Sequence, residues 1–314
     1  MDHSGHGMDL LPFTLGRGLA WSADPFFLVG CLLGLALYGW GVVRLVRRGD
    51  KWPVGRTVSF VVGVLLVLLV TCTGLNDYGM VMFSVHMVQH MVISMLAPIM
   101  LLLGAPITLA LRALPVAGKG RKGPRELLLM LLHSWYMRIV THPAFTIPMF
   151  IASLYALYFT PLFDFLMGSK PGHVAMMLHF LAVGLFFFWP IMGVDPGPHR
   201  PGHLMRMLEL FAGMPFHAFF GIALMMASAP MVKTYEDPPA SLGIDALADQ
   251  NAAGGIAWAF SEIPSVLVLL ALLFQWYRSE QRQARRKDRA ADRDGDKELE
   301  AYNAYLASLN ARSH

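Results

Sequence analysis

The chain has 314 residues, of which 55% are hydrophobic and only 15% are charged, and its mean hydropathy is +0.50. Soluble domains carry about 25% charged residues, so the composition excludes an ordinary soluble protein and predicts an integral membrane protein. The formal net charge of +4 does not indicate nucleic-acid binding, because the basic residues follow a topological pattern. Cys31 and Cys72 are the only cysteines, which excludes a disulfide framework.

Seven apolar runs of roughly 20 residues predict seven transmembrane helices in an all-α, polytopic membrane protein. The predicted spans are 25–46, 55–74, 80–103, 144–163, 172–192, 207–230 and 254–277. Segment 126–141 is too short and too polar at its ends to span, and it is expected to lie at the membrane surface as an amphipathic helix. Residues 1–24 would then form an extracytoplasmic His/Met tail, 25–277 the membrane domain and 278–314 a charged cytoplasmic tail.

The basic residues indicate the orientation of these spans. All but three of the 25 Lys and Arg residues fall in alternate connections between spans or in the C-terminal tail. Cytoplasmic loops carry an excess of Lys and Arg. The pattern therefore predicts an N-terminus outside the cell and a C-terminus in the cytoplasm.

The third predicted span lies within the stretch Met80–Pro106, which carries His86 and His90 four residues apart. This spacing places both imidazoles on one face of a helix, one turn apart. His179 and His217, on the fifth and sixth spans, fall at a similar depth in the outer half of the membrane. Ionisable side chains at membrane depth are costly and usually functional, so we expect these four histidines to converge on one metal site.

Copper is the metal that this pattern favours. Imidazole suits copper, zinc and iron, whereas thioethers select soft Cu(I), and several of the 21 methionines share the histidine layer. Candidate residues that would orient the ligands or relay the ion are Glu262, Asp77, Met87 and Met176. The alternative is structural: a buried histidine is often a satisfied core residue, and methionine is a common gap-filler.

The N-terminal segment MDHSGHGM is also rich in metal ligands. His3, His6 and Met8 would capture copper on the outer side. The alternative for such a short polar end is simple disorder.

Four motifs, taken together, resemble a known family. They are HMVQHMVISMLAPIMLLLGAP, HFLAVGLFFFWPIMGVDP, MPFHAFFGIAL and DQNAAGGIAWAFSEIPSVLVLL. This chain resembles the CtaG-type cytochrome c oxidase assembly proteins over about residues 25–277. The resemblance implies a multi-pass protein of a bacterial plasma membrane that helps to mature the copper centres of haem-copper oxidases. By this resemblance, the family's histidine positions correspond to His86, His90, His179 and His217, and one of its acidic positions corresponds to Asp249.

Two classes of function are compatible with these residues. The first is a non-enzymatic copper chaperone, whose partners would be cytochrome c oxidase subunits, the lipid bilayer and, as candidate donors, other copper chaperones. The second is a haem-binding membrane electron-transfer protein, although two histidines four residues apart cannot occupy opposite faces of one haem. A copper transporter is a further alternative, but it would need more inner-side ligands than Met205, Met207 and Met214.

Overall fold

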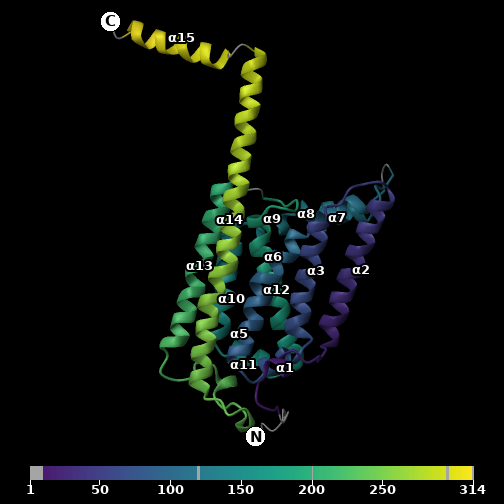
Figure 1. The fold of residues 1–314 in the computed structure, drawn as a ribbon, viewed down its shortest axis with the longest axis vertical. Coiled ribbons are helices and arrows are strands. Elements are labelled where there is room, and N and C mark those ends of the chain that lie inside the picture. Colours follow the sequence, from purple (N-terminus) through teal and green to yellow (C-terminus); the bar gives the residue numbers. More distant parts are fainter. Residues whose placement is uncertain (1–9, 119–120, 200, 295–296, 313–314) are drawn as a thin grey trace. The chain divides into compact units, whose positions relative to one another are not determined.

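The computed structural model describes residues 10–118, 121–199, 201–294 and 297–312, and these residues fold as helices and connections (Figure 1). Within those ranges no strand forms, and the only β-type pairing is an isolated bridge between Trp21 and Thr73. The predicted all-α fold is therefore confirmed. Several helices begin at clear capping signals: Asp24 accepts hydrogen bonds from Phe26 and Phe27 ahead of Pro25, and Ser169 accepts one from Gly172.

The helices follow one another along the chain with short connections. They are α1 (Leu15–Gly18), α2 (Pro25–Arg47), α3 (Val54–Thr71), α4 (Gly74–Gly79), α5 (Phe83–Met91), the π-helix η1 (Val92–Leu96), α6 (Ala97–Leu103), α7 (Pro106–Ala113), α8 (Pro124–Leu132), α9 (Trp135–Val140), α10 (Pro143–Tyr158), α11 (Leu162–Met167), α12 (Lys170–Met192), α13 (His203–Met226), the 3-10 helices η2 (Lys233–Tyr235) and η3 (Ala240–Leu242), α14 (Ala246–Asp294) and α15 (Lys297–Arg312).

Six helical segments in the described part of the chain are long and apolar enough to cross a membrane. They are Pro25–Arg47, Val54–Thr71, Phe83–Ala113, Lys170–Met192, His203–Met226 and Ala246–Arg293. The fourth predicted span, 144–163, corresponds to the shorter apolar helix α10 followed by α11. The break falls just before Pro161, because a residue preceding proline is disfavoured in the helical region. The predicted surface helix 126–141 is likewise divided, into α8 and α9.

The segment formed by α5, η1 and α6 lies at the centre of the first of two compact units, residues 1–268. In this segment, α6 packs against α3 and α12, and η1 packs against α12. The helix widens into the π-turn of η1 just before Pro98, whose ring lacks an N–H group and would clash with the carbonyl of Ser94. Gly184 on α12 faces this turn so closely that a Cβ there would overlap the Ser94 carbonyl oxygen.

The start of α5 is held by Asp249, which belongs to the distant helix α14. Its carboxylate accepts a hydrogen bond of 2.5 Å from the backbone N–H of Phe83 and one of 3.3 Å from that of Ser84. It also accepts from the Ser84 hydroxyl. The residue at the N-cap position, Met82, makes no such bond itself. Asp249 therefore caps α5 in place of a local residue, and its charge is favourable at a helix N-terminus.

The second compact unit comprises residues 269–314 and contains the C-terminal part of α14 and all of α15. The predicted charged tail begins inside α14, because this helix continues without interruption to Asp294. Most side chains from Arg278 to Arg293 are exposed, as expected for a charged run.

We expect Asp249→Ala to lower the free energy of unfolding by about 1–2 kcal/mol, because the first turn of α5 loses its cap. The measurement is the thermal melting midpoint of the purified protein in detergent. The exposed Glu236, which lies in the connection before α14, provides the control variant Glu236→Ala. Equal melting midpoints for both variants would show that the cap contributes nothing.

We expect Gly184→Ala to destabilise the protein by about 1–3 kcal/mol, because the added methyl group forces α12 away from η1. The matched control is Gly34→Ala, since a Cβ at Gly34 meets nothing within 4 Å. That control should be neutral or stabilising by about 0.5–1 kcal/mol, as expected for Gly→Ala inside a helix. The same melting measurement compares the two, and a neutral Gly184→Ala would contradict the close packing.

Candidate functional site: a buried histidine cluster

The two histidines of α5 point into the interior of the helix bundle. The exposed fraction of His86 is 0% and that of His90 is 3%, and the two residues lie one turn apart on this helix, as their spacing predicts. The two rings nevertheless have different histidine partners. Each forms a pair with a second buried histidine from another helix.

His86 pairs with His173, which lies in the first turn of α12. Their ring centres are 6.4 Å apart. The Nε2 atom of His86 shares a hydrogen bond of 2.9 Å with the hydroxyl of Tyr158, and the ring of Phe163 packs edge-on at 5.0 Å. The Nδ1 atom of His86 and the Nε2 atom of His173 are buried without a hydrogen-bond partner.

His90 pairs with His217, which lies in the middle of α13. Their ring centres are 6.1 Å apart and the rings are inclined by only 20°. The ring of Phe180 packs edge-on against His90 at 4.1 Å. Both ring nitrogens of His90 and Nε2 of His217 are buried without a hydrogen-bond partner. His217 also lines a cavity of about 10 Å³ together with Met95 and the serines of α14, Ser261 and Ser265.

The unpartnered nitrogens of this cluster are chemically unusual. Native structures leave very few buried polar atoms without a partner, because each costs about 1–3 kcal/mol. Here five imidazole nitrogens on four histidines lack one. Among the residues that the structure describes, no group of three or more His, Cys, Asp or Glu side chains is arranged to hold a metal ion. The cluster therefore presents two pairs of imidazoles, each able to accept a small ligand, rather than one preformed multidentate site.

His179 lies apart from the other three predicted ligands. Its side chain is exposed, and its Nε2 shares a hydrogen bond of 2.9 Å with the hydroxyl of Ser153. It lines an apolar groove of about 440 Å³ formed by α10, α11 and α12, together with Met149 and Met176. The ring of Phe180, the residue that follows His179, packs edge-on against His90 with ring centres 4.1 Å apart, and its ring centre lies 6.1 Å from that of His179.

The other predicted residues have varied environments. Met87 and Met176 are buried, Asp77 is half-buried in α4, and Glu262 is exposed on α14 although its neighbours Ser261 and Ser265 face His217. Asp249 caps α5 and so acts on the cluster only through the backbone. His3, His6 and Met8 lie outside the described residues.

Sequence reasoning missed the aromatic residues that enclose the cluster. Tyr158 ends α10 and contacts both His86 and His90. Tyr235, from the connection after α13, stacks on Phe83 with ring centres 5.0 Å apart and donates a hydrogen bond of 2.8 Å to the carbonyl of Gly79. Burial raises the pKa of Tyr235 well above its ordinary value, so the phenol remains a donor. The sequence feature that could have identified Tyr158 is a hydroxyl-bearing side chain near the end of an apolar span.

Comparison with known proteins places the chain among bacterial relatives. It is 46% identical over 304 residues to an uncharacterised protein of Mycobacterium tuberculosis and to one of Mycobacterium bovis, covering 95% of this chain and 46% of each relative. It is 47% identical over 284 residues to an uncharacterised protein of Mycobacterium leprae, covering 89% of this chain and 43% of that relative. The chain thus spans less than half the length of the curated relatives it matches. No solved structure matches it.

The chain also matches the model of a protein family whose description names a function. The model described as cytochrome c oxidase caa3 assembly factor (Caa3_CtaG) covers residues 36–279. That range includes both imidazole pairs, the Asp249 cap and the groove at His179, and it extends over more than half of the chain. This multi-pass membrane protein therefore belongs to the cytochrome c oxidase caa3 assembly factor family, as the resemblance of its four motifs predicted.

Proposed function

We propose that this protein supports the assembly of cytochrome c oxidase by binding Cu(I) at the buried histidine cluster and delivering it to an oxidase copper centre. The observation that carries the proposal is the set of five buried imidazole nitrogens without hydrogen-bond partners. A bound cation would satisfy one lone-pair nitrogen on each ring and remove the cost of leaving those atoms unpaired. The second nitrogen of His90 would carry its proton. In this proposal copper is the cargo, and the protein is a carrier rather than an enzyme.

The donor set favours a soft ion. Imidazole nitrogens suit copper, and a thioether beside them selects Cu(I) over harder cations. Met95 lines the same small cavity as His217, so His90, His217 and Met95 form the proposed primary site. His86 and His173 form the second pair, which would accept the ion by ligand exchange without any change in its oxidation state.

The groove at His179 is the proposed exit for copper. It joins the exposed His179 and the partly exposed Met149 and Ser153 in an apolar groove, with Met176 buried in its wall. An oxidase subunit embedded in the same bilayer would meet the carrier at this groove. Phe180 packs against His90 and directly follows His179 in the chain, so in this proposal a movement of the Phe180 ring opens the way from the cluster to the exit. His179 then acts after copper has been bound rather than as a member of the initial site.

The proposed topology has seven spans, with the N-terminus outside and the C-terminus in the cytoplasm. The six long apolar helices and the alternating distribution of Lys and Arg support it. The remaining span would be α10, whose 16 residues rise about 24 Å and are followed directly by α11. The histidine cluster then lies in the outer half of the membrane, on the side where copper is supplied and where the N-terminal His/Met tail would capture it.

A haem-binding role is the weaker candidate for these histidines. The cavity that His217 lines is about 10 Å³, which suits an ion but not a porphyrin. The rings of Phe150 and Phe180 pack at 4.9 and 4.1 Å from His217 and His90, where a macrocycle would need space. A copper transporter would require further ligands toward the inner face, which the buried pairs do not supply.

We expect the purified protein to bind Cu(I) and the double variant His86→Ala, His90→Ala to lose this binding, because one ligand is removed from each imidazole pair. Metal analysis after anaerobic loading and dialysis measures the bound copper, and an absorption spectrum of the same sample tests for haem. The control is His133→Ala, since His133 is exposed and hydrogen-bonded to the Leu129 carbonyl. Undiminished copper in the double variant, or a Soret band in the wild type, would refute the proposed site.

We expect Tyr158→Phe to weaken Cu(I) binding at the His86–His173 pair by about 10- to 100-fold, the usual effect of removing a hydrogen bond that orients a metal-binding histidine. Competition with a Cu(I) chelator of known affinity provides the measurement. Tyr155→Phe is the matched control on the same helix, because the Tyr155 hydroxyl donates instead to the Phe216 carbonyl. Similar affinities for the two variants would show that Tyr158 does not orient His86 for copper.

A further inference from the structure

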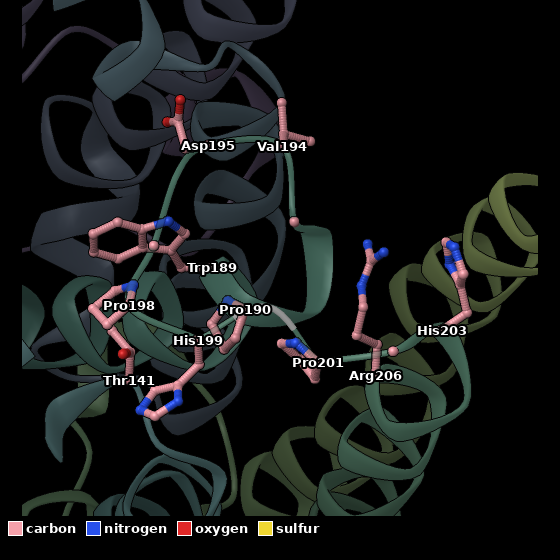
Figure 2. A pocket seen from close by; sticks show the side chains of 13 residues that line it. Thr141, Trp189, Pro190, Val194, Asp195, Pro198, His199, Pro201, His203 and Arg206 are labelled. Atoms are coloured by element: carbon pink, nitrogen blue, oxygen red, sulfur yellow. The ribbon is translucent and has the colours of Figure 1, made fainter. Parts of the chain in front are cut away.

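A polar cavity of about 350 Å³ lies at the opposite end of α12 from His173 (Figure 2). It is bounded by the C-terminus of α12, the Pro-rich connection that follows, the end of α9 and the first turn of α13. This volume falls within the range of small-molecule sites, about 300–1,000 Å³. None of the residues assigned to copper lines it, so the cavity requires a separate explanation.

Two nitrogen atoms of the cavity residues lack partners. The indole Nε1 of Trp189 and the ring Nδ1 of His203 are buried without a hydrogen bond, and both residues line the cavity. An indole N–H acts only as a donor, and a histidine nitrogen acts as one in the appropriate tautomer. In Figure 2, Trp189 stands on one side of the cavity, whereas His203 and Arg206 rise from α13 on the other. Donors thus approach from two helices.

A buried cation accompanies these donors. Arg206 is 7% exposed, and its guanidinium donates to the carbonyls of Ile191 and Met192, with both distances 2.5 Å. These bonds cap the end of α12 and fix the positive charge at the cavity wall. Gly193 adopts φ +60°, and a Cβ there would lie 3.1 Å from the guanidinium, so glycine permits this close approach.

Two acidic residues lie near this cation. Asp195 also lines the cavity, but its carboxylate is engaged with the start of α7, accepting from the N–H groups of Ile107 and Thr108 and from the Thr108 hydroxyl. Glu209 lies about one turn further along α13 and does not line the cavity, although its buried carboxyl group interacts electrostatically with Arg206. The first turn of α13 contains no acidic residue, and its N-cap, Gly202, makes no side-chain bond, so the positive end of the helix dipole remains uncompensated.

We propose that this cavity binds a phosphate group, and that an anionic phospholipid headgroup or a free phosphate compound supplies it. A phosphate offers several strong acceptor oxygens to donors arriving from different directions, and basic pockets between membrane helices are known to receive anionic headgroups. The site lies where two membrane helices end and begin, at the level of headgroups rather than acyl chains. An anion there would tie α12 to α13 at their shared end.

The test uses the full-length protein, purified and delipidated in detergent. Binding of phosphatidylglycerol, of phosphatidylcholine with the same acyl chains, and of inorganic phosphate is measured by native mass spectrometry and by the shift of the thermal melting midpoint. The variants are Trp189→Phe and His203→Ala, which remove the unpartnered nitrogens. Arg206 is left intact because it caps α12. The control is Trp135→Phe, since Trp135 is exposed on α9 and does not line the cavity.

We expect each variant to weaken phosphatidylglycerol binding about tenfold, the effect of one lost charge-assisted hydrogen bond, with no change for Trp135→Phe. Phosphatidylcholine should bind more weakly than phosphatidylglycerol, because its headgroup has no net negative charge. If inorganic phosphate binds and is lost in the same variants, while phosphatidylglycerol binding is unaffected, the ligand is a free phosphate compound. Unaltered binding of both phosphate sources in both variants, or equal binding of the two lipids, would overturn the proposal.

Discussion

The carboxylate of Asp249 at the first turn of α5 is the interaction on which the arrangement of the cluster depends. It bonds to the backbone of Phe83 and Ser84 and so fixes where α5 begins, which fixes the height of His86 and His90 within the bundle. At the other end of the same segment, the π-turn before Pro98 and the close contact with Gly184 prevent the helix from sliding. A helix held at both ends can present two imidazoles to neighbours on α12 and α13.

The cost of this arrangement explains its form. Burying imidazoles without hydrogen bonds is unfavourable by about 1–3 kcal/mol for each unsatisfied group, and aromatic rings pack closely around them. Phe163, Phe180 and Phe150 each lie within 5.0 Å of a histidine ring, measured between ring centres. Such a site is stable only if the surrounding packing supports it, and it gains free energy when a ligand occupies it. That coupling is suited to a carrier that must take up and release its cargo.

The two ends of α12 have opposite chemical character. Near its start, His173 faces another imidazole among aromatic side chains, which suits a soft cation. Near its end, Gly193 lies against the Arg206 guanidinium and the unpartnered indole N–H of Trp189 lines the same cavity, which suits an anion. The same helix thus connects a proposed copper site with a proposed phosphate site, and close glycine contacts at Gly184 and Gly193 keep it in register with η1 and α13.

Composition and hydrophobic run length determined the membrane class, the helical fold and most span positions, because a bilayer allows few alternatives to apolar helices. The i, i+4 spacing determined that His86 and His90 share a face, since this follows from helix geometry alone. Tertiary structure decided which histidines meet. The orientation of α12 about its own axis buries His173 and exposes His179, although both lie in the same apolar run. It also decided that Asp249 caps α5 and that Tyr158 bonds to His86, because these contacts join residues from separate helices. Residue spacing along one helix carries no information about how the neighbouring helices are oriented about their axes, because that orientation is set by packing.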